Sequence, residues 1–262
     1  MINKIKGVEK HIYSLREDSP LAIPQIDPEK LTLDETINLG NKFEKMGVGH
    51  IAIGSSLIKR QPLQDAIDVL IKDFDFTIVT YISNTHSFSI VGKENRTAIY
   101  WMTIFNANNL YYLRDALIQG APMLNTEHLE PIPTSYVFDD RDSKGTANWL
   151  SQPNLIPYDK PEISVSVALA SQYLGIRFYI MAGGSNSRLP PSKAHVKAVK
   201  KNSNLFLIPT SGIKSESVAK ELFAAGADAL HLGSIIEEKN GLNKFERIFK
   251  LSKTFTGKNF LG

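Results

Sequence analysis

The chain has 262 residues, of which 42% are hydrophobic, and a formal net charge of +3 at pH 7. It contains no cysteine, which excludes disulfides and thiolate chemistry. The charge is too small to indicate a dedicated nucleic-acid binder, and no uninterrupted apolar run approaches the roughly 20 residues of a membrane span. The first residues, MINKIKGVEK, lack the apolar segment of a secretory signal peptide. We therefore expect a cytoplasmic protein with a sizeable hydrophobic core.

Strand-like and helix-like segments alternate along the whole chain. Short apolar segments predict strands at 21–27, 50–54, 76–81, 97–105, 130–139, 177–183, 205–212 and 227–233. Amphipathic segments predict helices near 33–46, 62–73, 108–119, 160–173, 191–201, 215–225 and 241–252. No helix is predicted after the third strand, where the sequence is typical of a loop or a short extended piece. A long polar loop is predicted at 140–158.

Repeated strand–helix units indicate a parallel sheet. Eight such units in about 250 residues match the size of a closed (β/α)8 barrel, the TIM-barrel fold. A doubly wound open sheet is the alternative with the same order of elements. No linker rich in Pro, Gly or Ser divides the chain, so a single domain over residues 1–262 is predicted.

The carboxyl ends of the last three predicted strands carry glycine next to serine or threonine. In barrels of this class active sites lie at this end of the strands, and phosphate sites commonly follow strands 7 and 8. Glycine lets the backbone approach a ligand closely, and amides at helix starts favour an anion. A phosphate site is therefore predicted, with tight turns as the alternative. The three turns contain Gly183, Gly184 and Ser185, then Ser211 and Gly212, then Gly233 and Ser234.

The first predicted strand ends at Asp27, directly before Pro28. Mg²⁺ is commonly held by one carboxylate together with phosphate oxygens and water. Asp27 is therefore a candidate Mg²⁺ ligand, and Ser56 at the neighbouring strand end could add a hydroxyl. The alternative is an aspartate that only caps a turn.

Several stretches resemble, in order and spacing, the geranylgeranylglyceryl phosphate synthase and heptaprenylglyceryl phosphate synthase family. They are LAIPQIDPEKL (21–31), HIAIGSS (50–56), WMTIFNANNLYYLRDALIQGAP (101–122), YIMAGGSNSRLPP (179–191) and IPTSGIKSESVAKELFAAGADALHLGSIIEE (208–238). The resemblance implies a TIM-barrel prenyltransferase. It implies that Mg²⁺ assists the joining of a polyprenyl diphosphate to the free hydroxyl of sn-glycerol 1-phosphate through an ether bond.

Carried over position by position, the resemblance implies roles for two groups of residues. Asp27 is implied as a catalytic metal ligand, with Ser56 as a second ligand, and Tyr179 as a catalytic residue at the acceptor. The substrate-binding residues that it implies are Tyr179, Met181, Ala182, Gly183, Gly184, Ser185, Ser211, Gly212, Gly233 and Ser234.

The sequence departs from the family pattern in three respects. Met181 stands where the family has a glutamate that handles the acceptor's hydroxyl, the glycine run after the seventh strand is reduced to Thr210, Ser211 and Gly212, and Gln25 replaces a basic residue. Loss of the glutamate suits 3-phosphoglycerate as the acceptor, because a nearby carboxylate repels a carboxylate-bearing molecule. It also suits a non-catalytic binder of phosphate or prenyl diphosphate. The general base stays open among Tyr179, His231 and released pyrophosphate.

The predicted partners are the two substrates and further copies of the chain. Trp149 in the long loop is a candidate interface residue of a homo-oligomer. Basic residues after Glu238 predict either a solvated helix face or a weak attraction to a membrane surface. A phosphosugar isomerase is the other enzyme class, but the sequence shows no carboxylate or lysine pair inside the predicted barrel. Aromatic residues that could line a trough for a prenyl chain of unspecified length are Tyr100, Trp101, Phe105, Tyr111, Tyr112 and Phe138.

Overall fold

The computed structural model describes residues 7–57, 59–81, 91–93, 95–127, 129–143 and 145–255. It confirms all of the predicted strands, and most of their residues are buried, as in a parallel sheet that is covered on both faces. The strands are β1 (Leu21–Ile26), β2 (His50–Ile53), β3 (Thr77–Thr80), β4 (Thr97–Ile104), β5 (Glu130–Phe138), β6 (Phe178–Ala182), β7 (Phe206–Pro209) and β8 (Ala229–Leu232).

The predicted helices are also confirmed. They are α2 (Leu33–Met46), α3 (Arg60–Asp73), α4 (Ala116–Glu127), α6 (Pro161–Tyr173), α7 (Lys193–Asn202), α8 (Glu216–Ala224) and α10 (Gly241–Ser252). Helix α4 lies later than predicted, after a π-helical turn, η3 (Tyr111–Asp115). Further helices are α1 (Gly7–Asp18), η1 (Pro28–Lys30), α5 (Thr146–Ser151), which lies inside the predicted loop, and α9 (Ser234–Glu237). Most of the connection in which no third helix is predicted, residues 82–90 and 94, lies outside the described residues.

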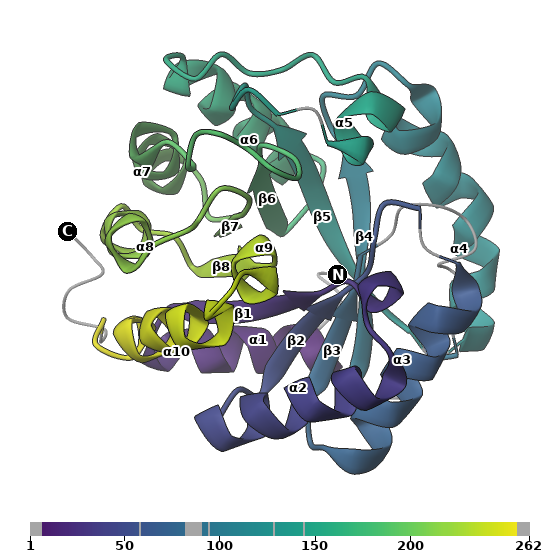
Figure 1. Cartoon of the computed structure of the whole chain (residues 1–262). Coiled ribbons are helices and arrows are strands. Elements are labelled where there is room, and N and C mark those ends of the chain that lie inside the picture. Colours follow the sequence, from purple (N-terminus) through teal and green to yellow (C-terminus); the bar gives the residue numbers. More distant parts are fainter. Residues whose placement is uncertain are drawn as a thin grey trace. The chain divides into compact units, whose positions relative to one another are not determined.

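The strands form one sheet in the order β7-β6-β5-β4-β3-β2-β1-β8. Strands β1 to β4 pair in parallel with one another in turn, as do β5 to β7, and a further parallel bridge joins Thr210, after β7, to His231 in β8. Figure 1 shows helices alternating with these strands along the chain. Strands that follow one another in sequence are neighbours in the sheet, and β8 lies next to both β1 and β7. This is the topology of a (β/α)8 barrel, so the predicted fold class is confirmed.

The chain divides into two compact units, each described by itself. Unit 1 comprises Met1–Ser14, Ile23–Trp101 and Ala116–Ile132, and includes β2, β3 and α2 to α4. Unit 2 comprises Leu15–Ala22, Met102–Asp115 and Pro133–Gly262, and includes β6 to β8 and α5 to α10. The single domain stays a prediction. Within the described ranges, no helix combines the length and the apolar character that crossing a bilayer requires.

In unit 2, small residues let helix α6 approach its neighbours closely. Ser164, Ala168 and Ser171 lie on its buried side. Ser135 of β5 donates a hydrogen bond of 2.7 Å to Ser171 Oγ, and Ser164 Oγ lies 2.7 Å from Nδ1 of His195 in α7. The face of β5 that carries Ser135 is therefore covered by α6.

Buried His50 of unit 1 predicts a pH dependence of stability. Its ring is 3% exposed, its Nδ1 lies 3.0 Å from Thr77 Oγ1, and burial lowers the pKa of His50 from 6.5 to about 3. Below the ordinary pKa the unfolded chain binds a proton that the folded chain does not, so stability is lost as the pH falls from 6.5 toward 3.

We expect His50 to contribute a slope of up to about 1.4 kcal/mol per pH unit to the free energy of unfolding in this range. His50→Asn should remove that contribution, as measured by urea denaturation between about pH 4.5 and 6.5. His11→Asn, at an exposed position of α1, removes a nearby charge that also lowers the pKa of His50, and should change the slope less than His50→Asn does because burial is the larger cause. Equal slopes in wild type and His50→Asn would contradict the assignment.

Candidate active site

The turn after β6 folds tightly against the loop that follows β5. A Cβ atom on Gly183 would lie 2.7 Å from Cδ of Arg141, and one on Gly184, where φ is +92°, would overlap a side chain of α5. Ser187 is buried and donates a hydrogen bond of 2.7 Å to the carbonyl oxygen of Gly184. Close backbone approach therefore requires glycine at both positions, while Ser185 is exposed beside them.

The turn after β7 holds two successive residues in the left-handed conformation. Ser211 has φ of +66° and Gly212 has φ of +71°. For a residue other than glycine this conformation costs roughly 1–2 kcal/mol, so neighbouring contacts must hold Ser211 in place. A Cβ on Gly212 would meet the carbonyl oxygen of Leu189 at 2.5 Å, which places this turn directly against the β6 loop. Strained residues of this kind cluster at ligand sites.

The end of β8 is joined to the same region. Thr210 Oγ1 donates a hydrogen bond of 3.2 Å to the carbonyl oxygen of His231, two residues before Gly233. Gly233 is half-buried and Ser234 is exposed at the start of the short helix α9. The structure thus brings the three predicted turns of unit 2 together at one end of their strands.

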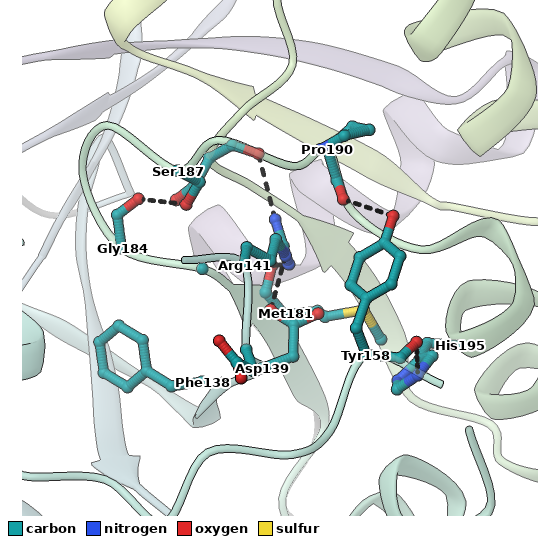
Figure 2. Close-up of polar contacts among 12 residues, drawn as sticks. Phe138, Asp139, Arg141, Tyr158, Met181, Gly184, Ser187, Pro190 and His195 are labelled. Atoms are coloured by element: carbon teal, nitrogen blue, oxygen red, sulfur yellow. Dashed lines mark hydrogen bonds and ion pairs between the residues drawn. The ribbon is translucent and has the colours of Figure 1, made fainter. Parts of the chain in front are cut away.

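A buried ion pair lies beneath these turns. Arg141 and Asp139 have side chains that are 0% and 1% exposed, and Arg141 Nε lies 2.6 Å from Asp139 Oδ1, without the angle of an aligned hydrogen bond. The guanidinium also donates to the carbonyl oxygens of Thr210 (2.6 Å), Ser211 (3.1 Å) and Met181 (3.2 Å). Figure 2 shows Arg141 inside the loop that follows β6. Burial raises the pKa of Asp139, and the guanidinium opposes that shift.

Sequence reasoning missed this pair. Arg141 lies in the charged stretch DDRDSKG, which predicts a solvated loop and gives no sign that one arginine is buried. A weak signal was available at Asp139, because it is the last residue of a predicted strand, and charged side chains at that end of a barrel strand often act in catalysis.

The predicted acceptor residues of β6 are all buried, on two different faces of the sheet. Tyr179 and Met181 pair in register with Ser135 and Val137, so they share the face that α6 covers. Tyr179 is 0% exposed, its hydroxyl has no hydrogen-bond partner within the described part of the chain, and burial raises its pKa. Met181 is 1% exposed. These positions give both side chains a packing role, and contact with an acceptor stays a prediction.

Ala182 lies on the opposite face of β6. It is fully buried and packs in a core cluster with Ile104, Ala107 and Phe138, against which Tyr112 also lies. Two aromatic residues of the predicted prenyl trough, Phe138 and Tyr112, therefore contribute to core packing here. Trp149, the candidate interface residue in α5, is 76% exposed.

The position of Met181 predicts the effect of a carboxylate at this site. Met181→Glu should lower the free energy of unfolding by at least about 2 kcal/mol at pH 7, because it buries a polar group in a packed layer. Burial raises the pKa of such a carboxyl, so the loss should shrink as the pH falls toward about 4, the ordinary pKa of a glutamate in the unfolded chain. Denaturant melts of Met181→Glu and of the matched Met181→Leu check this, and the leucine variant should lose less than about 1.5 kcal/mol. A stable glutamate variant with faster acceptor turnover would instead place residue 181 at the acceptor.

The predicted metal ligands lie in unit 1. Asp27 and Ser56 follow β1 and β2, whose ends are joined by a hydrogen bond of 3.0 Å from Gly54 N to the carbonyl oxygen of Ile26. Asp27 Oδ1 accepts a hydrogen bond of 3.2 Å from Glu29 N, and its Oδ2 lies 3.5 Å from Lys30 Nζ. No cluster of three or more His, Asp or Glu able to hold a metal occurs among the described residues. One carboxylate fits Mg²⁺ that is held mainly by phosphate oxygens of a substrate.

Comparison with known proteins places this geometry in a family. The model of the PcrB family matches residues 13–252. The chain belongs to the PcrB family. Geranylgeranylglyceryl phosphate synthase of Nitrosopumilus maritimus is 32% identical over 252 residues, which cover 95% of this chain and 96% of the relative. The enzyme of the same name from Thermofilum pendens is 30% identical over 89% of each chain.

A solved structure similar to this chain has the same fold. It is (S)-3-O-geranylgeranylglyceryl phosphate synthase from Thermoplasma acidophilum in complex with its substrate sn-glycerol-1-phosphate, with a TM-score of 0.86 and 25% identity, over 95% of this chain and 100% of that chain. The sequence-based resemblance to this prenyltransferase family is therefore confirmed, and with it the barrel fold.

Proposed function

We propose that this protein is a prenyltransferase that joins a polyprenyl diphosphate to sn-glycerol 1-phosphate through an ether bond. The observation that carries the proposal is the near-complete alignment with geranylgeranylglyceryl phosphate synthases, which extends over 95% of this chain in the Nitrosopumilus maritimus relative. An alignment of that extent includes every strand end at which a barrel enzyme builds its active site.

The proposed acceptor site consists of the three turns of unit 2. Glycine at 183, 184 and 212 allows the backbone to approach an anion, and the polar hydrogens of successive amides favour a phosphate. The other proposed contacts are the backbone of Ser185, Gly233 and Ser234. Pinning the phosphate there holds the acceptor's hydroxyl in one place, which supplies the proximity that a bimolecular reaction needs.

The proposed leaving-group site contains Asp27, with Ser56 at the end of the neighbouring strand. Bound Mg²⁺ would neutralise the negative charge that develops on the diphosphate as it leaves. In the reaction the C–O bond between the allylic carbon and the diphosphate breaks, the acceptor's oxygen forms the new C–O bond, and the hydroxyl proton is released. Because burial raises the pKa of Tyr179, its hydroxyl stays protonated and is suited to donate a hydrogen bond rather than to accept that proton.

Three further properties belong to the proposal on sequence grounds. They are a cytoplasmic location, a homo-oligomer, and a weak attraction of the basic helix α10 to an anionic membrane surface. The prenyl chain length is left open, so assays start from geranylgeranyl diphosphate, the donor that the relatives' names indicate.

Release of pyrophosphate tests the proposal. Wild-type protein with geranylgeranyl diphosphate and Mg²⁺ should release pyrophosphate with sn-glycerol 1-phosphate, and at least tenfold more slowly with 3-phosphoglycerate or with sn-glycerol 3-phosphate. Faster release with 3-phosphoglycerate would assign that acceptor instead. Absence of release with all three acceptors, in protein that still binds them, would indicate a non-catalytic binder.

A further inference from the structure

The fully buried Arg141 does more than neutralise Asp139. Its side chain makes one ion pair and three hydrogen bonds to carbonyl oxygens, and these contacts come from the ends of three strands. Its own carbonyl oxygen accepts a hydrogen bond of 3.1 Å from the backbone N–H of Arg188, in the loop after β6. One residue therefore sets the relative positions of the strand ends β5, β6 and β7 within unit 2.

The carbonyl contacts fix the direction of the neighbouring amides. In a trans peptide the C=O and N–H bonds point to opposite sides. Because the carbonyl oxygens of Thr210 and Ser211 face the guanidinium, the N–H groups of Ser211 and Gly212 point away from it. Both peptides of the turn after β7 are thus held with their N–H groups directed to the side opposite Arg141.

The strain at Ser211 indicates that these contacts are needed. Serine at φ of +66° is in a disfavoured conformation that must be held by its surroundings. A planar guanidinium with several fixed donors suits this task, because it can bond to two successive carbonyl oxygens and to a carboxylate at the same time. A lysine has a single charged nitrogen and cannot satisfy these groups in the same geometry.

We propose that Arg141 is a positioning residue for the acceptor's phosphate: it holds the left-handed peptides of Ser211 and Gly212 in the orientation that binds the anion. The inference rests on the proposed function only for the identity of the anion. Arg141 itself is buried beneath the turn and does not contact the ligand.

Binding of sn-glycerol 1-phosphate alone, measured by isothermal titration calorimetry without a prenyl diphosphate, tests this role. Arg141→Lys should weaken binding at least tenfold. Ser211→Gly in the Arg141→Lys background should restore affinity to within about threefold of wild type, because glycine adopts the left-handed conformation without strain. A residue that only supports packing is not rescued in this way. Arg188→Lys, whose side chain is 78% exposed, is the matched control and should bind as wild type does.

Two results overturn the proposal: normal affinity in Arg141→Lys, or lost affinity that Ser211→Gly does not restore. If Arg141→Lys does not fold, Asp139→Asn replaces it, because it removes the carboxylate that lies 2.6 Å from Nε and leaves the arginine in place. Asp139→Asn should weaken binding of sn-glycerol 1-phosphate at least threefold, and Ser211→Gly in that background should restore the affinity. Unchanged affinity in Asp139→Asn overturns the proposal. Wild-type protein that binds the phosphate but does not transfer a prenyl group refutes the proposed function and leaves the role of Arg141 intact.

Discussion

Asp27→Asn is expected to reduce prenyl transfer about 100-fold or more at saturating acceptor, with little change in stability. The substitution removes the negative charge that would hold Mg²⁺ against the leaving diphosphate, and each tenfold loss in rate corresponds to about 1.4 kcal/mol of the barrier. Asparagine keeps the side-chain oxygen that accepts from Glu29 N at the start of η1, so the turn should remain capped. Initial rates at several Mg²⁺ concentrations, together with a thermal melt, measure both effects.

Asp34→Asn is the matched control for that charge. Asp34 is exposed in the first turn of α2, in the same unit, and is not one of the predicted metal ligands. Its loss should change the transfer rate less than about twofold, since exposed charges contribute little. Wild-type Mg²⁺ dependence and rate in Asp27→Asn would show that the aspartate only caps its turn.

Gly212→Ala is expected to raise the KM for sn-glycerol 1-phosphate about 10- to 100-fold and to leave the KM for geranylgeranyl diphosphate nearly unchanged. Alanine at φ of +71° is strained, and its Cβ atom would lie 2.5 Å from the carbonyl oxygen of Leu189. The turn must shift to relieve this contact, which moves the amides that are proposed to bind the phosphate. Steady-state kinetics with each substrate varied in turn separates the two KM values.

Gly175→Ala provides a control with the same backbone strain. Gly175 has φ of +81° in the exposed turn after α6, and a Cβ atom there meets nothing within 4 Å. Gly175→Ala should lower the free energy of unfolding by about 1 kcal/mol, the same loss that strain alone causes in Gly212→Ala. Its kinetic constants should be those of the wild type. Equal KM values for the acceptor in the two variants would show that the turn after β7 is not part of the acceptor site.

The elements that could be predicted from sequence are those with strong local signals. Apolar segments predicted all of the barrel strands. The bounds predicted for α2, 33–46, agree with the structure, in which Thr32 and Glu35 form a capping box and Gly47 ends the helix in the left-handed conformation. Helix α1 was missed because its stretch, GVEKHIYSLRED, is mostly polar and buries few side chains.

The site was predictable only in part, because its key contacts are distant in sequence. The glycines of the three turns are visible from local composition. The bonds of Arg141 to the carbonyl oxygens of Thr210 and Ser211 join residues 69 and 70 positions apart, and no local pattern marks them. The direction of Met181 likewise follows from its register with Val137 and not from its position in the motif.

Mass spectrometry of the reaction product tests the central claim most directly. Wild-type protein is incubated with geranylgeranyl diphosphate, sn-glycerol 1-phosphate and Mg²⁺, and the lipid fraction is analysed before and after phosphatase treatment. We expect a single product in which the geranylgeranyl group is joined to glycerol phosphate by an alkali-stable ether bond. Recovery of only geranylgeraniol or unreacted diphosphate, from folded protein that binds both substrates, would contradict the assignment of this chain as a prenyltransferase.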